Sequence, residues 1–280
     1  MIMQERKLRM VALETVCYVA GAGAFSVFIR WLQTMLAYNE EQLVDASVFN
    51  FLVPAIIIAS IFLFRGFLKK FRKERYFIPE DFFEAFKNDS KIYSVLRWLI
   101  GIVMIVGSVM LLMECEVDRE AKFLRILSLG GVIVGICFPI LFTSANKPHV
   151  TKIGSICFLT AVPVVFYCFW LITCYKINSI NPVLWDYAME VIALIVCILS
   201  FFYLAGFPYS VQKPWRAMFF AMLGCAMCIM MMADERYMGM EFMYLGGAAM
   251  QLYCVWVMIC NMGQNEKEFN VQPTGNADKE

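Results

Sequence analysis

Three polar residues within otherwise apolar stretches carry most of the chemistry that this sequence offers: Asn50, Asp186 and Glu190. Asp186 and Glu190 are four residues apart, so they share one face of a helix. Ionisable groups at membrane depth are costly and usually face protein or a water-filled cavity. We therefore predict an outward-facing cation or protonatable site, with Arg30 or Arg125 as partners. The alternative is that both carboxylates simply lie in the headgroup region.

Other kinds of site find little support in the residues. The only histidine, His149, stands beside Pro148 without a cluster of further ligands, and a metal site needs several. Cys225 and Cys228, followed by many methionines, would suit monovalent copper. Methionine is also a common filler of apolar cores, which is the interpretation we favour. No catalytic residue, metal, cofactor or nucleic-acid partner is predicted, and enzymatic activity is not favoured.

Eight apolar stretches decide the class of the protein. Each has the length that a helix needs to cross the hydrocarbon core of a bilayer. Only 17% of the residues are charged, against roughly 25% in soluble domains. We predict an all-α, polytopic membrane protein embedded in the lipid bilayer, with spans at about 10–32, 46–66, 95–113, 123–144, 153–175, 185–207, 215–233 and 239–262.

The positions of lysine and arginine predict the orientation. Eighteen of the 24 fall at one end of the predicted spans, together with both termini. By the positive-inside rule that end is cytoplasmic, in the cell membrane. The remaining six lie at the outer end: Arg30, Arg119, Lys122, Arg125, Lys176 and Arg236. The polar tail, 263–280, is predicted to be a disordered cytoplasmic segment.

The two halves of the chain resemble each other. Residues 58–67 read IASIFLFRGF and residues 198–207 read ILSFFYLAGF, with five identities at an offset of 140. Four spans per unit is an even number, so both units would cross the membrane in the same sense. We predict two parallel four-helix halves, 1–144 and 145–262, in which Asn50 corresponds to Glu190. Chance similarity between apolar helices is the alternative.

The segment 67–94, between the second and third spans, is the longest connection and opens with a basic cluster. Pro79, two acidic residues and a phenylalanine face follow, which predicts a short amphipathic helix on the inner membrane surface. The cluster either enforces topology beside anionic headgroups or, with an exposed phenylalanine patch, binds a cytosolic partner protein. The candidate residues are Lys69, Lys70, Arg72, Lys73, Arg75, Phe82, Phe83 and Phe86.

Two further features concern the helices themselves. Gly131 and Gly135 form a GxxxG pair, which predicts close helix packing within the bundle rather than dimerisation. Prolines within three spans predict kinks that expose carbonyl groups. Cys115 and Cys174 both lie at outer helix ends, where a disulfide between them is an open alternative to two free thiols.

Two functions are favoured, while an enzyme that acts on lipid or a lipid-linked substrate is a third alternative that no set of residues supports. The leading hypothesis is a small-solute permease, because of the repeat, the prolines and the outer polar residues. The competing hypothesis is a non-catalytic membrane subunit or sensor that binds a partner through 67–94. A permease needs a water-accessible path past Asn50 or Glu190, whereas a subunit needs a solid bundle with an exposed patch at Phe82, Phe83 and Phe86.

Overall fold

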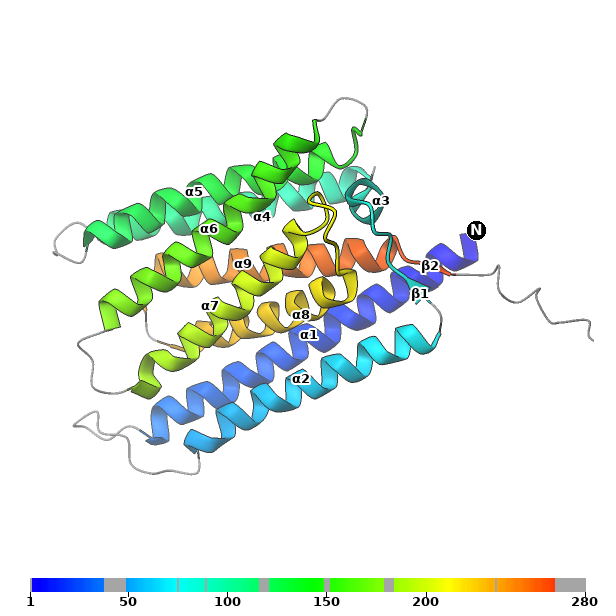
Figure 1. The fold of residues 1–280 in the computed structure, drawn as a ribbon. Helices are drawn as coiled ribbons and strands as arrows, with labels where there is room; N and C mark the ends of the chain where they lie inside the picture. The colour runs from blue at the N-terminus through cyan, green and yellow to red at the C-terminus, as the bar shows by residue number, and fades with distance from the viewer. Residues whose placement is uncertain are drawn as a thin grey trace, which may run out of the picture.

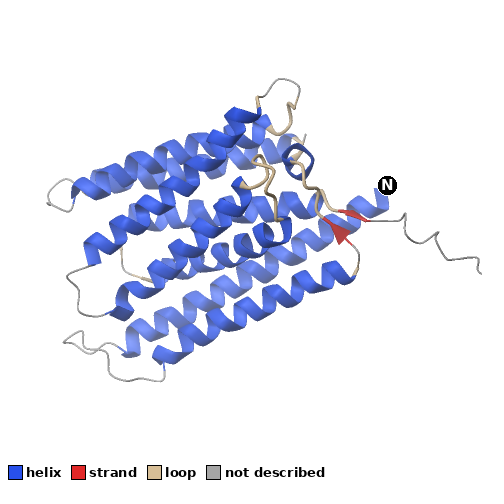
Figure 2. Cartoon of the chain, viewed as in Figure 1, coloured by secondary structure: helices blue, strands red, loops and turns tan. Residues whose placement is uncertain are grey.

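Long apolar segments form most of the computed structural model, in which 86% of the described residues are helical. The structure describes residues 2–37, 49–74, 76–88, 90–115, 121–148, 152–178, 184–234 and 236–264. Figure 2 shows helices throughout, with two short strands. In chain order the elements are α1 (Ile2–Ala37), α2 (Phe49–Lys73), β1 (Tyr76–Phe77), α3 (Phe82–Phe86), α4 (Lys91–Glu114), α5 (Ala121–Ser144), α6 (Ile153–Asn178), α7 (Leu184–Ala205), α8 (Pro214–Met230), the 3-10 turn η1 (Met231–Ala233), α9 (Met238–Cys260) and β2 (Gly263–Gln264).

Eight of these helices are long and apolar enough to cross a membrane, namely all except α3. This confirms the predicted all-α class and the order of eight long apolar helices, which fit a multi-pass membrane protein. Pro54, Pro139 and Pro163 lie inside α2, α5 and α6, and each helix continues through its proline. The prolines therefore do not divide these helices into separate segments.

The last two spans form the centre of the bundle. The helix α8 contacts α1, α2, α7 and α9, and α9 also contacts α1 and α4. In Figure 1 the α4–α5 pair lies on one side of α9 and the α1–α2 pair on the other. The two pairs of the first half are thus separated by helices of the second half. This packing does not show the two four-helix units predicted from the sequence.

Glycines set the closest approach between helices. A Cβ atom at Gly131 would lie only 2.1 Å from Ser108 Oγ, and one at Gly135 only 2.8 Å from the carbonyl oxygen of Gly101. Both glycines of the GxxxG pair therefore face α4 within the same bundle. Gly239 of α9 meets α4 about as tightly, since its Cβ would lie 2.2 Å from the backbone nitrogen of Leu111.

The helix predicted in the segment 67–94 is present as α3, but it lies against protein. Asp81 caps it by accepting hydrogen bonds from the backbone N–H groups of Phe83 (3.0 Å) and Glu84 (3.3 Å). Phe82 and Phe86 are only 2% and 1% exposed. The expectation that the phenylalanine face covers the membrane surface or forms an exposed patch is therefore wrong for Phe82 and Phe86, while Phe83 is half-buried.

Contacts with α5 and with the segments just after α7 and α9 explain the burial of α3. The ring of Phe86 packs edge-on against Phe142, at 5.4 Å between centroids, and against Phe207, at 5.3 Å. Asn261, just after α9, donates hydrogen bonds to the carbonyl oxygens of Ala85 and Lys87, each at 2.9 Å. The strand β1 pairs antiparallel with β2. We call this end of the bundle, with α3 and the two strands, the linker end.

Candidate functional site

Of the three polar residues singled out in the sequence, Glu190 becomes the centre of a site. It lies in the first turns of α7 and is 1% exposed. Asn50 and Asp186 fall in the first turns of α2 and α7, and their side chains lie outside the described part of the structure. The structure therefore neither supports nor opposes a shared site for the three.

Glu190 is held by Tyr244 of α9 and by Arg236, which lies just before that helix. Tyr244 donates a hydrogen bond of 2.7 Å to one carboxylate oxygen, and Arg236 forms an ion pair with the other. The sequence had suggested Arg30 or Arg125 as the direct partner of this carboxylate. Instead, Arg125 donates to the carbonyl oxygen of Cys115, at 3.2 Å.

Arg30 joins the same site through a second carboxylate. Asp234 accepts from Arg30 Nε at 2.7 Å and from Arg236 Nη2 at 3.0 Å. Arg30 also donates to Gln33 Oε1, at 2.8 Å, and both of these residues belong to α1. We call Arg30, Asp234, Arg236, Glu190 and Tyr244 the charge network, and the end of the bundle that holds it the network end.

Short secondary-structure elements bring these groups together. The helix α8 ends at Met230 and η1 follows, so the chain turns before Asp234 and reaches Arg236 just before α9 begins. Glu114, at the end of α4, accepts a hydrogen bond of 3.1 Å from the backbone N–H of Gly239. That carboxylate accepts from one of the N–H groups left free at the start of α9, and its negative charge interacts favourably with the positive end of the helix dipole.

The electrostatics of the charge network are balanced. Two guanidinium groups face two carboxylates, whereas an unpaired buried charge would cost several kcal/mol. Burial alone would lower the pKa of Arg236, but the charges of Glu190 and Asp234 outweigh this effect and raise its pKa above the ordinary value. Arg236 is therefore a permanent cation.

Exposure decreases from one side of the charge network to the other. The side chains of Arg236 and Asp234 are 14% and 10% exposed, whereas those of Glu190 and Arg30 are 1% and 2% exposed. The network thus reaches from the surface at the network end into the bundle. Beyond Tyr244, Trp170 lies 4.6 Å away between ring centroids and stacks on Tyr167, so aromatic rings border its deeper side.

Cysteines lie further along the same helices. The Sγ atoms of Cys197 and Cys228 are 3.3 Å apart, and Gln251 donates to Cys197 Sγ at 3.3 Å. Among the described residues no group of three or more histidine, cysteine or carboxylate side chains is arranged to hold a metal. Cys115 and Cys174, the pair considered for a disulfide, are both free and buried. Burial raises the pKa of the Cys115 thiol, so it stays protonated at neutral pH.

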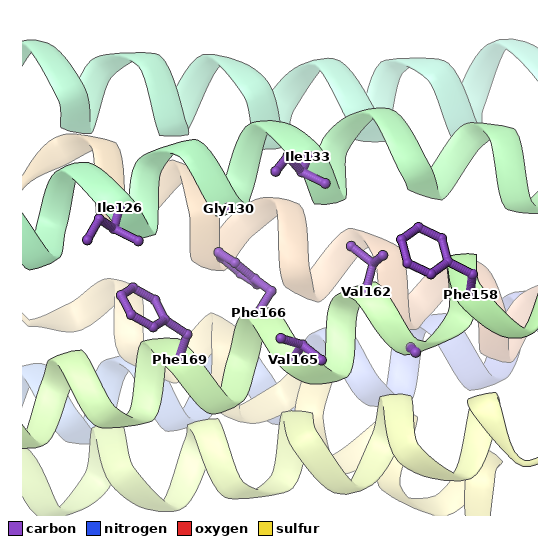
Figure 3. Close-up of a pocket in the computed structure, with 9 residues that line it drawn as sticks. Ile126, Gly130, Ile133, Phe158, Val162, Val165, Phe166 and Phe169 are labelled. Carbon is purple, nitrogen blue, oxygen red and sulfur yellow. The ribbon is translucent and has the colours of Figure 1, made fainter.

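A groove of about 370 Å³ lies between α5 and α6 (Figure 3). Its lining is entirely apolar: Ile126, Gly130, Ile133, Phe158, Ala161, Val162, Val165, Phe166 and Phe169. Several of these side chains are more than half exposed, which fits a face of the bundle that meets lipid. A polar solute would find no hydrogen-bonding side chain there.

The basic cluster at the end of α2 lies on the surface. Lys69, Lys70, Arg72 and Lys73 are exposed, and Arg72 lies over the ring of Trp215, at 5.1 Å from its centroid. Arg75 lies outside the described residues. Exposure of these cations is compatible with either headgroups or an acidic partner.

Comparison with known proteins found no matching family model, no matching curated protein and no matching solved structure. Function must therefore be argued from the geometry of the chain itself. The sequence interpretation missed Asp234, Arg236 and Tyr244 as members of the site. The signal for Arg236 was its position, because Arg30 and Arg236 are two of only six cations at the outer end of the predicted spans.

Proposed function

We propose that the protein is a small-solute permease in a closed state, and that the charge network is its gate at the network end. The observation that carries this proposal is the burial of Glu190, 1% exposed, beneath Asp234 and Arg236. Charged groups at membrane depth that face the bundle interior commonly mark a solute or ion pathway. If the ion pair between Arg30 and Asp234 broke, α1 would lose its charged link to the segment that precedes α9.

The balance of charge in the network suggests the class of solute. A purely anionic solute that displaced a carboxylate would leave that carboxylate unpaired, and a purely cationic solute would do the same to an arginine. A small zwitterion offers both signs at once. Arg236 Nε is buried and has no hydrogen-bond partner among the described residues, so it offers a donor for the carboxylate of such a solute.

The proposal includes the cell membrane as the location, with both termini inside and the network end outside. It is supported by the three-to-one excess of lysine and arginine at the end that holds the termini. With this orientation the gate faces the exterior, while α3 and the exposed lysines of α2 face the cytoplasm.

The native thiol of Cys174 provides a test of the gate, because it lies beside the carboxylate of Glu190 and is only 3% exposed. A membrane-impermeant maleimide added outside intact cells should label Cys174 slowly in the unmodified protein. Asp234→Asn removes the carboxylate that both arginines share, so labelling should become about tenfold faster, the ratio that corresponds to about 1.4 kcal/mol in the opening equilibrium. Peptide mass spectrometry distinguishes Cys174 from the other cysteines.

Two controls keep this test specific. Asp81→Asn changes a carboxylate at the linker end and should leave the labelling of Cys174 unchanged. Cys254, buried in α9, should stay unlabelled in every variant, since its reaction would indicate unfolding. If Cys174 resists the reagent both in the unmodified protein and in folded Asp234→Asn, the network is a static clamp and the permease proposal fails.

A solute panel tests the charge argument separately. Glycine, acetate and methylammonium represent a zwitterion and its two halves. Glycine should slow the labelling of Cys174 at concentrations where the other two have no effect. If acetate protected Cys174 as well as glycine does, the proposal of a zwitterionic solute would be wrong. The proposal of a gated pathway would still stand.

The internal duplication belongs to the same proposal. In that correspondence α1, α2, α4 and α5 of the first half match α6, α7, α8 and α9, and Asn50 matches Glu190. Spin labels at positions 50 and 190 should then lie at equal membrane depth, within about one helical turn of 5.4 Å. A larger difference would speak against the duplication.

One observation favours the second candidate, a subunit that binds a partner protein. Lys69, Lys70 and Lys73 project from the end of α2 and are exposed. Cross-linking in cells through a photoreactive residue at position 70 should capture an acidic protein if this hypothesis holds. A matched probe at the exposed position Lys152, elsewhere on the same side, should not capture it.

A further inference from the structure

We propose that the groove between α5 and α6 binds one anionic glycerophospholipid, whose phosphate lies between Lys122 and Lys176 and whose acyl chain fills the groove. The groove is lined by apolar side chains (Figure 3), several of which are more than half exposed. Its shape, its position along the two helices and the cations beyond its end support this occupant.

The apolar part of the groove has the length of an acyl chain. On α6 it extends over the twelve residues from Phe158 to Phe169, whose ends are about 16 Å apart along the helix. That is about half of the roughly 30 Å hydrocarbon core, and it lies about the middle of α6, which extends from Ile153 to Asn178, so a chain anchored at Lys176 would reach past the midplane to fill it. Gly130 leaves room on the α5 side, because a Cβ there would approach the ring of Phe166 to 3.0 Å.

The two lysines continue the faces that line the groove. Lys122, Ile126, Gly130 and Ile133 follow a spacing of four, four and three residues along α5, so they lie on one helical face. Lys176 is eighteen residues after Phe158, which is five full turns of α6. Both lysines are exposed. On each helix, the lysine therefore lies on the same face as the apolar residues that line the groove.

A cation–π contact brings the end of α6 that carries Lys176 close to the start of α5, which carries Lys122. The ammonium group of Lys176 lies over the ring of Phe123, 5.0 Å from its centroid, and Phe123 follows Lys122 directly. A phosphate at this position would meet positive charge from both helices while its chain continues into the groove. Acyl chain and phosphate together define the chemistry of a phospholipid.

The cations at this end of the predicted spans fall into two groups. Only six lysines and arginines fall at this end of the predicted spans, where the positive-inside rule disfavours them. Arg30 and Arg236 belong to the charge network. The other four, Arg119, Lys122, Arg125 and Lys176, flank the start of α5 and the end of α6. The same stretch carries Glu114, Glu116, Asp118 and Glu120, so the proposal uses only Lys122 and Lys176, which lie at the end of the groove.

The test compares phosphatidylglycerol with phosphatidylcholine. Purified protein in detergent is incubated with equal amounts of each lipid, and retained lipid is counted by native mass spectrometry. The unmodified protein should retain phosphatidylglycerol preferentially. Lys122→Gln with Lys176→Gln should lower that preference by about fivefold for each lysine, the ratio that corresponds to about 1 kcal/mol.

Matched controls come from the opposite ends of the same two helices. Lys147→Gln with Lys152→Gln removes two exposed lysines beside the end of α5 and the start of α6. This pair should leave the preference unchanged. Ala161→Leu fills the groove while every charge remains, and it should reduce retention of both lipids.

Each outcome decides the proposal. It is overturned if phosphatidylglycerol shows no preference in the unmodified protein, or if the preference survives Lys122→Gln with Lys176→Gln. It is also overturned if the control pair at Lys147 and Lys152 abolishes the preference equally. Retention unchanged by Ala161→Leu in folded protein would place the lipid outside the groove and reject the assigned site.

Discussion

The two ends of the bundle are closed in different ways. At the network end, four charges from α1, α7 and the segment before α9 pair with one another. At the linker end, aromatic packing of Phe86 and amide hydrogen bonds from Asn261 hold α3 in place. Ion pairs between helices are few, strong and dependent on charge, whereas the contacts of the linker end are numerous, short-range and neutral.

This difference indicates which end can open. The loss of Asp234 alone would disturb both arginines, because they share its carboxylate. No single side chain at the linker end has a comparable position among the described contacts, since the rings, the amides and the β1–β2 pair act in parallel. We expect changes at the network end to have the larger effects, and the following predictions are ordered accordingly.

The largest effect is expected from Glu190→Gln. Arg236 would keep Asp234 but lose the carboxylate that is most deeply buried, and breaking a buried pair typically costs about 3–5 kcal/mol. Thermal unfolding in detergent, followed with a dye that fluoresces on reaction with exposed cysteines, measures the change. Glu241→Gln, which alters a carboxylate in the first turn of the same α9, serves as the control. Equal losses in both variants would contradict a special role for Glu190.

A smaller loss, about 1–3 kcal/mol, is expected from Gly239→Ala. The added methyl group would lie 2.2 Å from Leu111 N, so α4 and α9 would have to move apart. Gly21→Ala is the matched control, since nothing lies within 4 Å of its Cβ position and alanine favours a helix. The same unfolding measurement should find that control unchanged or slightly more stable. A stable Gly239→Ala protein would mean that the network end depends on charge alone.

At the linker end, Asn261→Asp should cost about 1–2 kcal/mol. The shape is kept but the donor to the Ala85 and Lys87 carbonyl oxygens is lost. Limited trypsin digestion of inside-out vesicles should then cleave faster near Lys87 and Lys91. Gln212→Glu, at the exposed contact with Glu80, provides a control in the same region. Unchanged cleavage in Asn261→Asp would show that the aromatic contacts suffice to hold α3.

The smallest effect on stability is expected from the joint change of Lys69, Lys70 and Lys73 to Gln. These side chains are exposed, so the unfolding free energy should change by less than about 0.5 kcal/mol. Circular dichroism against temperature in detergent checks this. A clear destabilisation would mean that the cluster, like the charge network, belongs to the packing of its end.

The sequence predicted the helices well because their signal is local. Each span needs only length and apolar composition, and GxxxG needs only the small size of Gly131 and Gly135. The order in which helices pack is not local. A resemblance between 58–67 and 198–207 predicted two units, yet α8 and α9 lie between the two pairs of the first half. Tertiary packing, which the repeat alone does not determine, decided that arrangement.

The site was predictable only in part for the same reason. Glu190 stands out because it is a carboxylate within an apolar helix. Its partner Arg236 comes from a connection whose path depends on where α8 ends, and no periodicity contains that information. The phenylalanines of α3 had the pattern of a surface helix. They are buried because the ends of α5, α7 and α9 provide a protein surface where lipid was expected.

The central position of α8 and α9 has a consequence for biosynthesis. Ribosomes deliver these two spans last, although α9 has the lowest mean hydropathy of the eight and its span is the most buried. The earlier helices must enter the bilayer while the surfaces reserved for α8 and α9 still face lipid or the insertion machinery. A nascent chain truncated before Pro214 would therefore expose the faces of α1, α4 and α7 on which those helices later assemble, and quality-control proteases should recognise it.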